Sequence, residues 1–315
     1  MMLEHGLHAD MEVLLSQRKA TAPASQSLEA RRAAWTAYSR TLAQPRPPGM
    51  RVEDVTLALP HRQVPVRIYR PADPACTGLA PCTIYLHGGG FVLGDLDSSD
   101  FIAWGIAEQA RCIVVSVDYA LSPEHPFPAA FDDTCACMAW VARHGEEWGM
   151  DPNRLAIAGD SAGANLAAAA CLASRDRGGP RLLAQALAYP WLTHDDRVQS
   201  RKLFALGPGL TTAGLRDYGA AYIGEAREPL GPYAWPLQAQ DLSGLPPALI
   251  HTAARDPVRD DGREYAARLC LAGVDVCHIE APGTIHAFLR ARFAGPMAAA
   301  QFARFAAFLR RRLHA

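Results

Sequence analysis

A serine between small residues is the first feature of this sequence that suits chemistry. Ser161 lies in the pentapeptide Gly-Asp-Ser-Ala-Gly at 159–163, after the apolar run 155–158 and before the alanine-rich run 164–170. Strand, sharp turn and helix in this order are typical of a nucleophile elbow, in which glycines let the strand and the helix approach closely. The pattern predicts that the serine Oγ is held out at the carboxyl end of a sheet, beside a helix N-terminus that favours negative charge.

Two further residues supply what a nucleophilic serine needs. A serine hydroxyl is a weak nucleophile near neutral pH, so it requires a base and a group that orients the base. Asp256 and His286 each follow a predicted strand, and both come after Ser161 in a chain order known for serine triads. We expect His286 to take the serine proton and Asp256 to orient His286.

Other acids and imidazoles compete for these two roles. Asp260 and Asp261 are the alternative acids, and Asp260 is expected to cap the helix that follows. His251 and His278 fall inside predicted strands and are expected to be structural. His194 comes earlier in the chain than the expected position of the base.

A run of glycines follows an earlier apolar strand and is suited to binding an oxyanion. Residues 87–91 read His-Gly-Gly-Gly-Phe. Without side chains, the backbone N–H groups of Gly88, Gly89 and Gly90 can face a substrate carbonyl, and the N–H of Ala162 is a second source of donors. No Gly-Lys-Ser/Thr follows the run, so a phosphate loop is not favoured.

The elements that position these groups alternate along the chain. A predicted antiparallel hairpin at 52–59 and 64–69 is followed by apolar runs that begin at 82, 113, 155, 184, 248 and 274, with helical segments between them. This alternation predicts an α/β fold, with a mostly parallel central sheet flanked by helices on both faces. The carboxyl ends of parallel strands share one edge, where the serine, the acid and the base are then expected to meet.

Two segments fall outside the alternation. Residues 1 to about 45 are predicted as N-terminal cap helices, and 46–315 as the catalytic domain, which contains an insertion at about 195–235 rich in Gly, Pro and aromatic residues. Insertions after strands lie at the ligand-binding edge of α/β sheets, so we expect the insertion to complete the cap. Five apolar residues near these loops are expected to line the substrate pocket: Phe91, Val92, Trp191, Phe204 and Phe288.

Composition narrows the class of protein. The chain has 315 residues, half of them hydrophobic, which is enough for a large core. Its net charge of -1 favours neither nucleic acid nor an anionic membrane as a partner. The sequence lacks a membrane-spanning apolar run and a signal-peptide pattern, which predicts a cytoplasmic protein. Most of the eight cysteines are expected to be free and buried, and the spacing of Cys135 and Cys137 does not indicate a metal site.

Five ordered blocks resemble those of the bacterial hormone-sensitive-lipase-like (family IV) carboxylesterases, within the α/β-hydrolase superfamily. They are the glycine run 87–91, residues 118–119 with 123–130, the serine turn 159–163, and the segments 256–260 and 283–288. The resemblance covers residues 50 to 315 approximately and implies an α/β-hydrolase fold, with the N-terminal helices and the insertion as its cap.

The resemblance also implies a function. Members of this family cleave carboxylic esters with short acyl chains and use no metal or cofactor, so we expect a serine carboxylesterase for small esters of short to medium chain length, acting through an acyl-enzyme. An amidase or aryl-formamidase with the same triad remains an alternative, as does a non-catalytic ligand-binding protein. A homodimer that forms along the last strand and the closing helix also remains an alternative. The implied site residues are the nucleophile Ser161, the base His286, the acid Asp256 and the oxyanion donors Gly89, Gly90 and Ala162, with Gly88 in the same turn.

Two positions depart from the family pattern. Ala120 stands where the family usually has the Arg of Tyr-Arg-Leu-Ala-Pro-Glu, and Ala164 stands where a further Gly often follows the serine turn. We expect the first change to remove a structural ion pair and the second to affect only the start of the helix. Neither is expected to change the triad.

Overall fold

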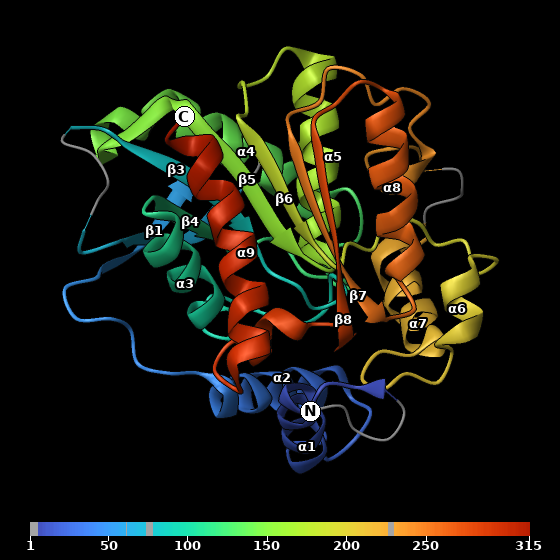
Figure 1. Cartoon of the computed structure of the whole chain (residues 1–315). Coiled ribbons are helices and arrows are strands. Elements are labelled where there is room, and N and C mark those ends of the chain that lie inside the picture. Colours follow the sequence, from blue (N-terminus) through green and yellow to red (C-terminus); the bar gives the residue numbers. More distant parts are fainter. Residues whose placement is uncertain (1–5, 61, 74–77, 226–229) are drawn as a thin grey trace.

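A single eight-stranded sheet forms the centre of the molecule (Figure 1). The computed structural model describes residues 6–60, 62–73, 78–225 and 230–315. The strand order is β1-β2-β4-β3-β5-β6-β7-β8; β1, β2 and β4 pair antiparallel, and all pairs from β4 to β8 are parallel. The strands are β1 (Arg51–Ala58), β2 (Gln63–Arg70), β3 (Ala80–Leu86), β4 (Ile113–Val117), β5 (Met150–Asp160), β6 (Ala184–Ala188), β7 (Ala248–Arg255) and β8 (Val276–Ile285).

Helices cover both faces of this sheet. On one face α3 and α9 pack together, and on the other α4, α5 and α8 pack against the central strands. In Figure 1, α1 and α2 lie beyond the arrowheads of the strands, and α6 and α7 lie close to them. The helices are α1 (Glu12–Ala20), α2 (Leu28–Leu42), α3 (Asp100–Ala110), α4 (Ala129–His144), α5 (Ala162–Arg177), α6 (Gln199–Leu203), α7 (Thr212–Ile223), α8 (Arg259–Leu271) and α9 (Pro296–Leu313).

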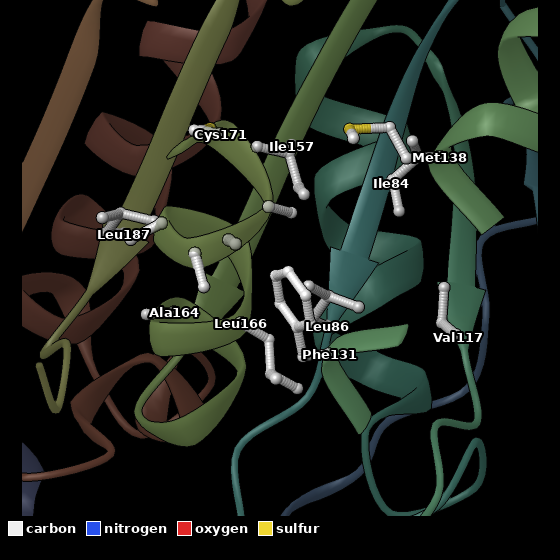
Figure 2. Packing of buried hydrophobic residues seen from close by; sticks show 14 of the residues in the cluster. Ile84, Leu86, Val117, Phe131, Met138, Ile157, Ala164, Leu166, Cys171 and Leu187 are labelled. Atoms are coloured by element: carbon white, nitrogen blue, oxygen red, sulfur yellow. The ribbon is translucent and has the colours of Figure 1, made fainter. Parts of the chain in front are cut away.

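The two-residue period of the strands divides the core into two layers. Along β3, Ile84 and Leu86 belong to the apolar cluster beneath α4 and α5, whereas Tyr85 between them belongs to the cluster beneath α3 and α9. Figure 2 shows the first of these layers, with Leu86 near Phe131 of α4 and Leu166 of α5. Because both faces are buried, the central strands are apolar throughout, as parallel strands usually are.

The fold class expected from the sequence is confirmed. The hairpin of β1 and β2 is antiparallel with β1 at the sheet edge, and the strands that follow are parallel. The last apolar run predicts a strand over 274–279, whereas β8 begins at Val276 and continues past Pro282 and Gly283. It runs on to Ile285, which an edge strand permits because a proline N–H is not required for pairing on its open side.

Two sequence properties can be compared directly with the structure. Within the described residues, no helix combines the length and apolarity needed to cross a bilayer. Cysteines 82, 112, 137 and 171 are buried and free, whereas Cys270 is exposed, and Cys76 lies outside the described residues. Burial raises the pKa of the Cys112 thiol to about 12, so this thiol stays protonated.

Candidate active site

Strand register brings the predicted base and acid together. Asp256 follows β7 directly and His286 follows β8 directly, and the residues before them, Arg255 and Ile285, are paired across these neighbouring strands. Ser161 follows β5 in the same way, two strands further along the sheet. The three side chains therefore project from the same edge of the sheet, at the carboxyl ends of parallel strands.

A continuous chain of hydrogen bonds joins these three residues. The Nε2 atom of His286 lies 2.8 Å from Ser161 Oγ, and its Nδ1 atom lies 2.7 Å from Asp256 Oδ2. With Nδ1–H donating to the carboxylate, Nε2 is free to accept the serine proton. Asp256 is fully buried, and its other oxygen accepts from the backbone N–H of Val258 at 3.0 Å. The carboxylate is therefore fixed from two sides.

The backbone at the serine is strained, as a nucleophile elbow requires. Ser161 has φ 55° and ψ -118°, a conformation that non-glycine residues rarely adopt. A Cβ atom at position 159 would overlap the Gly163 carbonyl, and one at position 163 would overlap the Leu86 carbonyl. Both flanking glycines are thus required by close backbone approach, as expected from the sequence.

The glycine run folds back beside the serine. Gly89 and Gly90 have φ angles of 137° and 63°, and a Cβ atom at position 90 would lie 2.5 Å from the Tyr218 ring. The Gly88 N–H donates to Asp160 Oδ1 at 2.9 Å, so it is occupied. Among the described residues, the N–H groups of Gly89, Gly90 and Ala162 meet no protein acceptor. The N–H groups of these three residues are therefore available to an oxyanion, whereas the N–H of Gly88 is not.

Asp160 has a structural role that the sequence did not reveal. Its carboxylate is nearly buried and accepts hydrogen bonds from Gly88 N–H, from the Tyr85 hydroxyl at 2.7 Å and from the Tyr189 hydroxyl at 3.3 Å. Burial, followed by the charge of Asp160, raises the pKa of both tyrosines well above the ordinary value, so both hydroxyls remain donors. Asp160 thereby ties the glycine loop to the serine turn.

The alternative acids have other partners. Asp260 was expected to be a helix N-cap, but the N-cap of α8 is Val258, and Asp260 lies in the first turn, where it pairs with Arg259 and Arg263. The helix therefore starts two residues earlier than expected, just after Val258, whose N–H donates to the Asp256 carboxylate. Asp261 is buried and pairs with Arg201 of α6 at 2.8 Å, which anchors the insertion to α8.

The alternative bases also lie away from the serine. His251 is buried within β7, where it contacts Gln301, and desolvation lowers its pKa to about 4. His278 is exposed in β8 and contacts the Thr252 hydroxyl. His194 packs against the Trp235 ring, with ring centroids 5.2 Å apart. His286 is the imidazole at hydrogen-bonding distance from Ser161.

A cavity of about 500 Å³, counting the space at its open mouth, lies directly over the serine. Its floor includes Ser161, His286 and the glycine run, and its walls come from the N-terminal helices, the insertion and the loop residues Leu93 and Trp191. Apolar side chains dominate these walls: Trp35, Leu93, Trp191, Leu210, Leu215 and Tyr218. Such a lining suits a small substrate with an apolar part.

Of the expected pocket residues, Trp191 lines this cavity, and the other four lie elsewhere in the described structure. Phe91 is buried and stacks on Tyr222 with centroids 3.6 Å apart. Val92 is also buried. Phe288 packs beneath Tyr189 and His251, and Phe204 lies under the Arg259 guanidinium. Proximity to a catalytic loop in sequence does not determine whether a side chain points into the cavity or into the core.

The two departures from the family pattern have local explanations. Next to Ala120 lies the buried carboxylate of Asp133, which accepts the Ala120 N–H at 2.7 Å and pairs with Arg62 from the β1–β2 turn. A guanidinium is therefore still present here, but it comes from elsewhere in the chain. Ala164 is fully buried in the first turn of α5. Neither residue contributes a polar side-chain atom to the hydrogen bonds of the triad.

A mostly parallel α/β sheet with a Ser-His-Asp arrangement at its carboxyl edge is the architecture of a serine hydrolase. Throughout the described part of the chain, no group of three or more His, Cys, Asp or Glu side chains is placed to hold a metal ion.

Comparison with known proteins identifies the family. A family model described as the alpha/beta hydrolase fold matches residues 83–290, so the chain belongs to that family. Esterase LipI of Mycobacterium tuberculosis is 42% identical over 248 residues, covering 78% of this chain and 77% of that protein. Carboxylesterase NlhH of the same organism is 41% identical over 272 residues, covering 85% of each chain. The resemblance to hormone-sensitive-lipase-like carboxylesterases is thereby confirmed.

Solved structures agree with this assignment. An ester hydrolase from the metagenome of Lake Arreo, solved in complex with a bipyridine phosphonate derivative, is 36% identical and superposes with a TM-score of 0.91 over 98% of this chain and all of that one. A thermostable esterase from Pseudomonas putida is 32% identical, with a TM-score of 0.91 and 98% coverage of each chain. The similarity thus extends over nearly the whole chain, including α1 and α2 as well as the sheet.

Proposed function

We propose that this protein is a serine carboxylesterase that hydrolyses small carboxylic esters of short to medium acyl chain length. The observation that carries the proposal is the hydrogen-bonded chain from Ser161 Oγ through His286 to Asp256, at the floor of an apolar cavity. Its relatives LipI and NlhH are named esterase and carboxylesterase, which supports the same reaction class.

The reaction proceeds in two halves. Ser161 Oγ attacks the ester carbonyl carbon while His286 Nε2 takes the hydroxyl proton, and Asp256 stabilises the imidazolium. The tetrahedral oxyanion accepts hydrogen bonds from Gly89, Gly90 and Ala162 N–H groups. The C–O bond to the alcohol then breaks, and His286 protonates the leaving oxygen.

Deacylation repeats these steps with water. His286 takes a proton from a water molecule as the water oxygen attacks the acyl carbon of the acyl-enzyme. The second tetrahedral oxyanion uses the same three N–H groups, and its collapse breaks the bond to Ser161 Oγ. His286 returns the proton to Oγ, and the carboxylic acid leaves.

In this proposal the cap consists of residues 1 to about 45 together with about 195–235, of which 1–5 and 226–229 lie outside the described residues. Arg18 and Trp35 from the first segment and Leu210, Leu215 and Tyr218 from the second contribute to the cavity walls over the serine. These walls leave room for small acyl and alcohol groups, so we expect activity to fall as the acyl chain outgrows the cavity. Cytoplasmic location and a homodimer through β8 and α9 stay predictions.

Replacing Ser161 with Ala tests the proposal. We expect hydrolysis of 4-nitrophenyl butyrate to fall by about 10⁶-fold in kcat, the scale seen when a triad serine is removed. Labelling with a fluorophosphonate should be lost at the same time, and circular dichroism should show an unchanged fold. Activity within a few fold of the unmodified protein would sink the assignment of the nucleophile.

A panel of 4-nitrophenyl esters of increasing acyl length, together with a matched 4-nitroanilide, measures the substrate class. We expect the short esters to be the best substrates and the anilide to be poor. Faster turnover of the anilide would favour the amidase alternative, and an absence of turnover with intact fluorophosphonate labelling would point to a reaction on another acyl compound.

A further inference from the structure

The catalytic cavity opens beside a second cavity formed by the cap. This second cavity, of about 530 Å³ counting the space at its open mouth, is lined mainly by α1, α2, the segment between them and α7. It shares four lining residues with the catalytic cavity, namely Arg18, Trp35, Leu93 and Tyr218. The two cavities are therefore adjacent, and the Arg18 side chain lies where they meet.

Two guanidinium groups line this outer space without a carboxylate partner. Arg18 lines both cavities and Arg31 lines the outer one. Across the described residues, neither forms an ion pair with an acidic side chain. By contrast, Arg32, the neighbour of Arg31 in α2, pairs with Glu124 at 2.7 Å.

Helix stability does not account for Arg31. It lies in the first turn of α2, where the helix dipole disfavours a cation. Its guanidinium lies over the Tyr218 ring, 5.1 Å from the centroid, which turns it toward the cavity wall. Arg18 lies in the last turn of α1 and is exposed. The two charges thus come from different helices and meet at one cavity.

The acidic group of the cavity floor is already engaged. Among the described residues that line the catalytic cavity, Asp160 is the acidic one. Its carboxylate oxygens accept hydrogen bonds from the Gly88 N–H and from the Tyr85 and Tyr189 hydroxyls. The guanidinium groups at the mouth are therefore free to bind an external anion. Guanidinium binds a carboxylate well because its planar donors match the two oxygens.

We propose that Arg18 and Arg31 form a substrate-recognition site for a carboxylate, and that the enzyme prefers esters that carry a free carboxylate at a distance from the scissile bond. This inference rests on the proposed esterase function. The carboxylate belongs either to the acyl part, as in a monoester of a dicarboxylic acid, or to the alcohol part. Both arrangements reach the same guanidinium groups, and the experiment separates them.

The test compares matched anionic and neutral substrates in each variant. On the acyl side, mono-4-nitrophenyl adipate and suberate are compared with their methyl diesters; succinate and glutarate are avoided because their own carboxylates cleave the ester. On the alcohol side, butyrate esters of hydroxyphenylacetic acid and of its methyl ester are compared, with product release followed by chromatography. The readout is the ratio of kcat/KM for the anionic ester to that for the neutral ester, so that general losses of activity cancel.

The variants remove charge but retain the side-chain stem. In Arg18→Gln and Arg31→Gln we expect the ratio to fall about two- to fivefold each, the scale of an exposed ion pair, and about tenfold in the double variant. The change should lie in KM, because the contact is equal in the ground and transition states. Adding salt should lower the ratio of the unmodified enzyme and leave that of the double variant unchanged.

Two matched controls remove a charge nearby. Lys19 is the next residue of α1, and Arg40 is an exposed cation of α2; neither lines either cavity within the described residues. Lys19→Gln and Arg40→Gln should keep the ratio of the unmodified enzyme. Arg18→Glu should lower the ratio further than Arg18→Gln.

The outcomes decide the inference independently of the esterase assignment. A ratio that stays within 1.5-fold in the double variant, or that falls equally in the Lys19 control, overturns the carboxylate site. In both cases the neutral esters still report esterase activity. If the unmodified enzyme cleaves neither neutral nor anionic esters, the result contradicts the proposed esterase function itself.

Discussion

The strand-end site and helix α2 are attached to the same sheet in different ways. Asp256 and His286 follow neighbouring strands directly, so backbone pairing at Arg255 and Ile285 sets their separation. Helix α2 has no strand of its own and is held by side chains. Arg32 of α2 donates to the carbonyls of Val92 and Ser122 and pairs with Glu124.

A second arginine, outside α2, also holds this helix. Arg290, four residues after His286, donates to Ser39 Oγ at 2.5 Å and to the Ser98 carbonyl at 2.8 Å. Its guanidinium also lies over the rings of Trp35 and Tyr38. Backbone pairing fixes catalytic groups within narrow limits, whereas long side chains hold a helix less rigidly. The comparison predicts that changes at the strand ends affect kcat and that changes at the α2 contacts affect KM.

The largest of these effects is expected at Asp256. In Asp256→Asn the amide disfavours the tautomer in which His286 accepts the serine proton, so kcat should fall about 10⁴-fold with little change in KM. Steady-state kinetics with 4-nitrophenyl butyrate measures both. Asp260→Asn is the matched control, because Asp260 pairs with arginines instead of an imidazole. A loss of less than tenfold in Asp256→Asn would contradict the triad.

The next effect concerns Asp160, which touches no reacting atom in the proposed mechanism. Asp160→Ala removes the acceptor of the Gly88 N–H and of two tyrosine hydroxyls. We expect kcat to fall about 10²–10³-fold, the cost of a displaced oxyanion donor, with KM little changed. Asp160→Asn should recover part of the loss, because its amide oxygen still accepts a hydrogen bond.

A purely structural role for Asp160 would give a different pattern. Loss of a buried acceptor costs about 1–3 kcal/mol in unfolding free energy. A structural role alone would therefore lower both the melting temperature and the number of active sites that a fluorophosphonate can label. The number of sites that a fluorophosphonate labels therefore serves to normalise kcat. If kcat per labelled site is unchanged in Asp160→Ala, Asp160 does not position the oxyanion loop.

Much of the strand-end site was predictable because its signals are local. Small residues on both sides of Ser161 and strands that end just before Asp256 and His286 are visible in the sequence. The position of Asp160 was visible too, but its partners come from two separate segments, residues 85–88 and residue 189. A role that depends on the approach of distant segments leaves no pattern in any one of them.

The cavity walls were harder to predict for a related reason. Phe91 and Phe288 are apolar and adjacent to catalytic loops, which is equally true of residues that line a pocket and of residues that support it. The structure buries both, whereas Trp191 lines the cavity. The guanidinium partner of Asp133 was likewise not visible, because Arg62 is 71 residues away along the chain. Side-chain direction and long-range pairing depend on the assembled fold.

The smallest expected effect lies at the α2 contacts. Arg32→Met keeps the side-chain length but removes the Glu124 ion pair and the bonds to two carbonyls. Glu124 is half exposed, and exposed pairs contribute only about 0.2–1 kcal/mol. We expect KM for neutral esters to rise about two- to fivefold, with kcat unchanged, because α2 supplies Trp35 to the cavity wall.

Glu124→Gln separates the two parts of this contact. It removes the charge pair and leaves the carbonyl bonds of Arg32, so its KM should lie between those of the unmodified enzyme and Arg32→Met. The hydrogen bond from Arg32 lowers the pKa of Glu124. A lowered carboxylate pKa means that the stabilisation is complete above the ordinary pKa and is lost as the pH falls through the lowered value. The ion pair is therefore intact in the unmodified enzyme across neutral pH, and Glu124→Gln should raise KM throughout that range. A fall in kcat with constant KM would contradict the division between the strand ends and the α2 contacts.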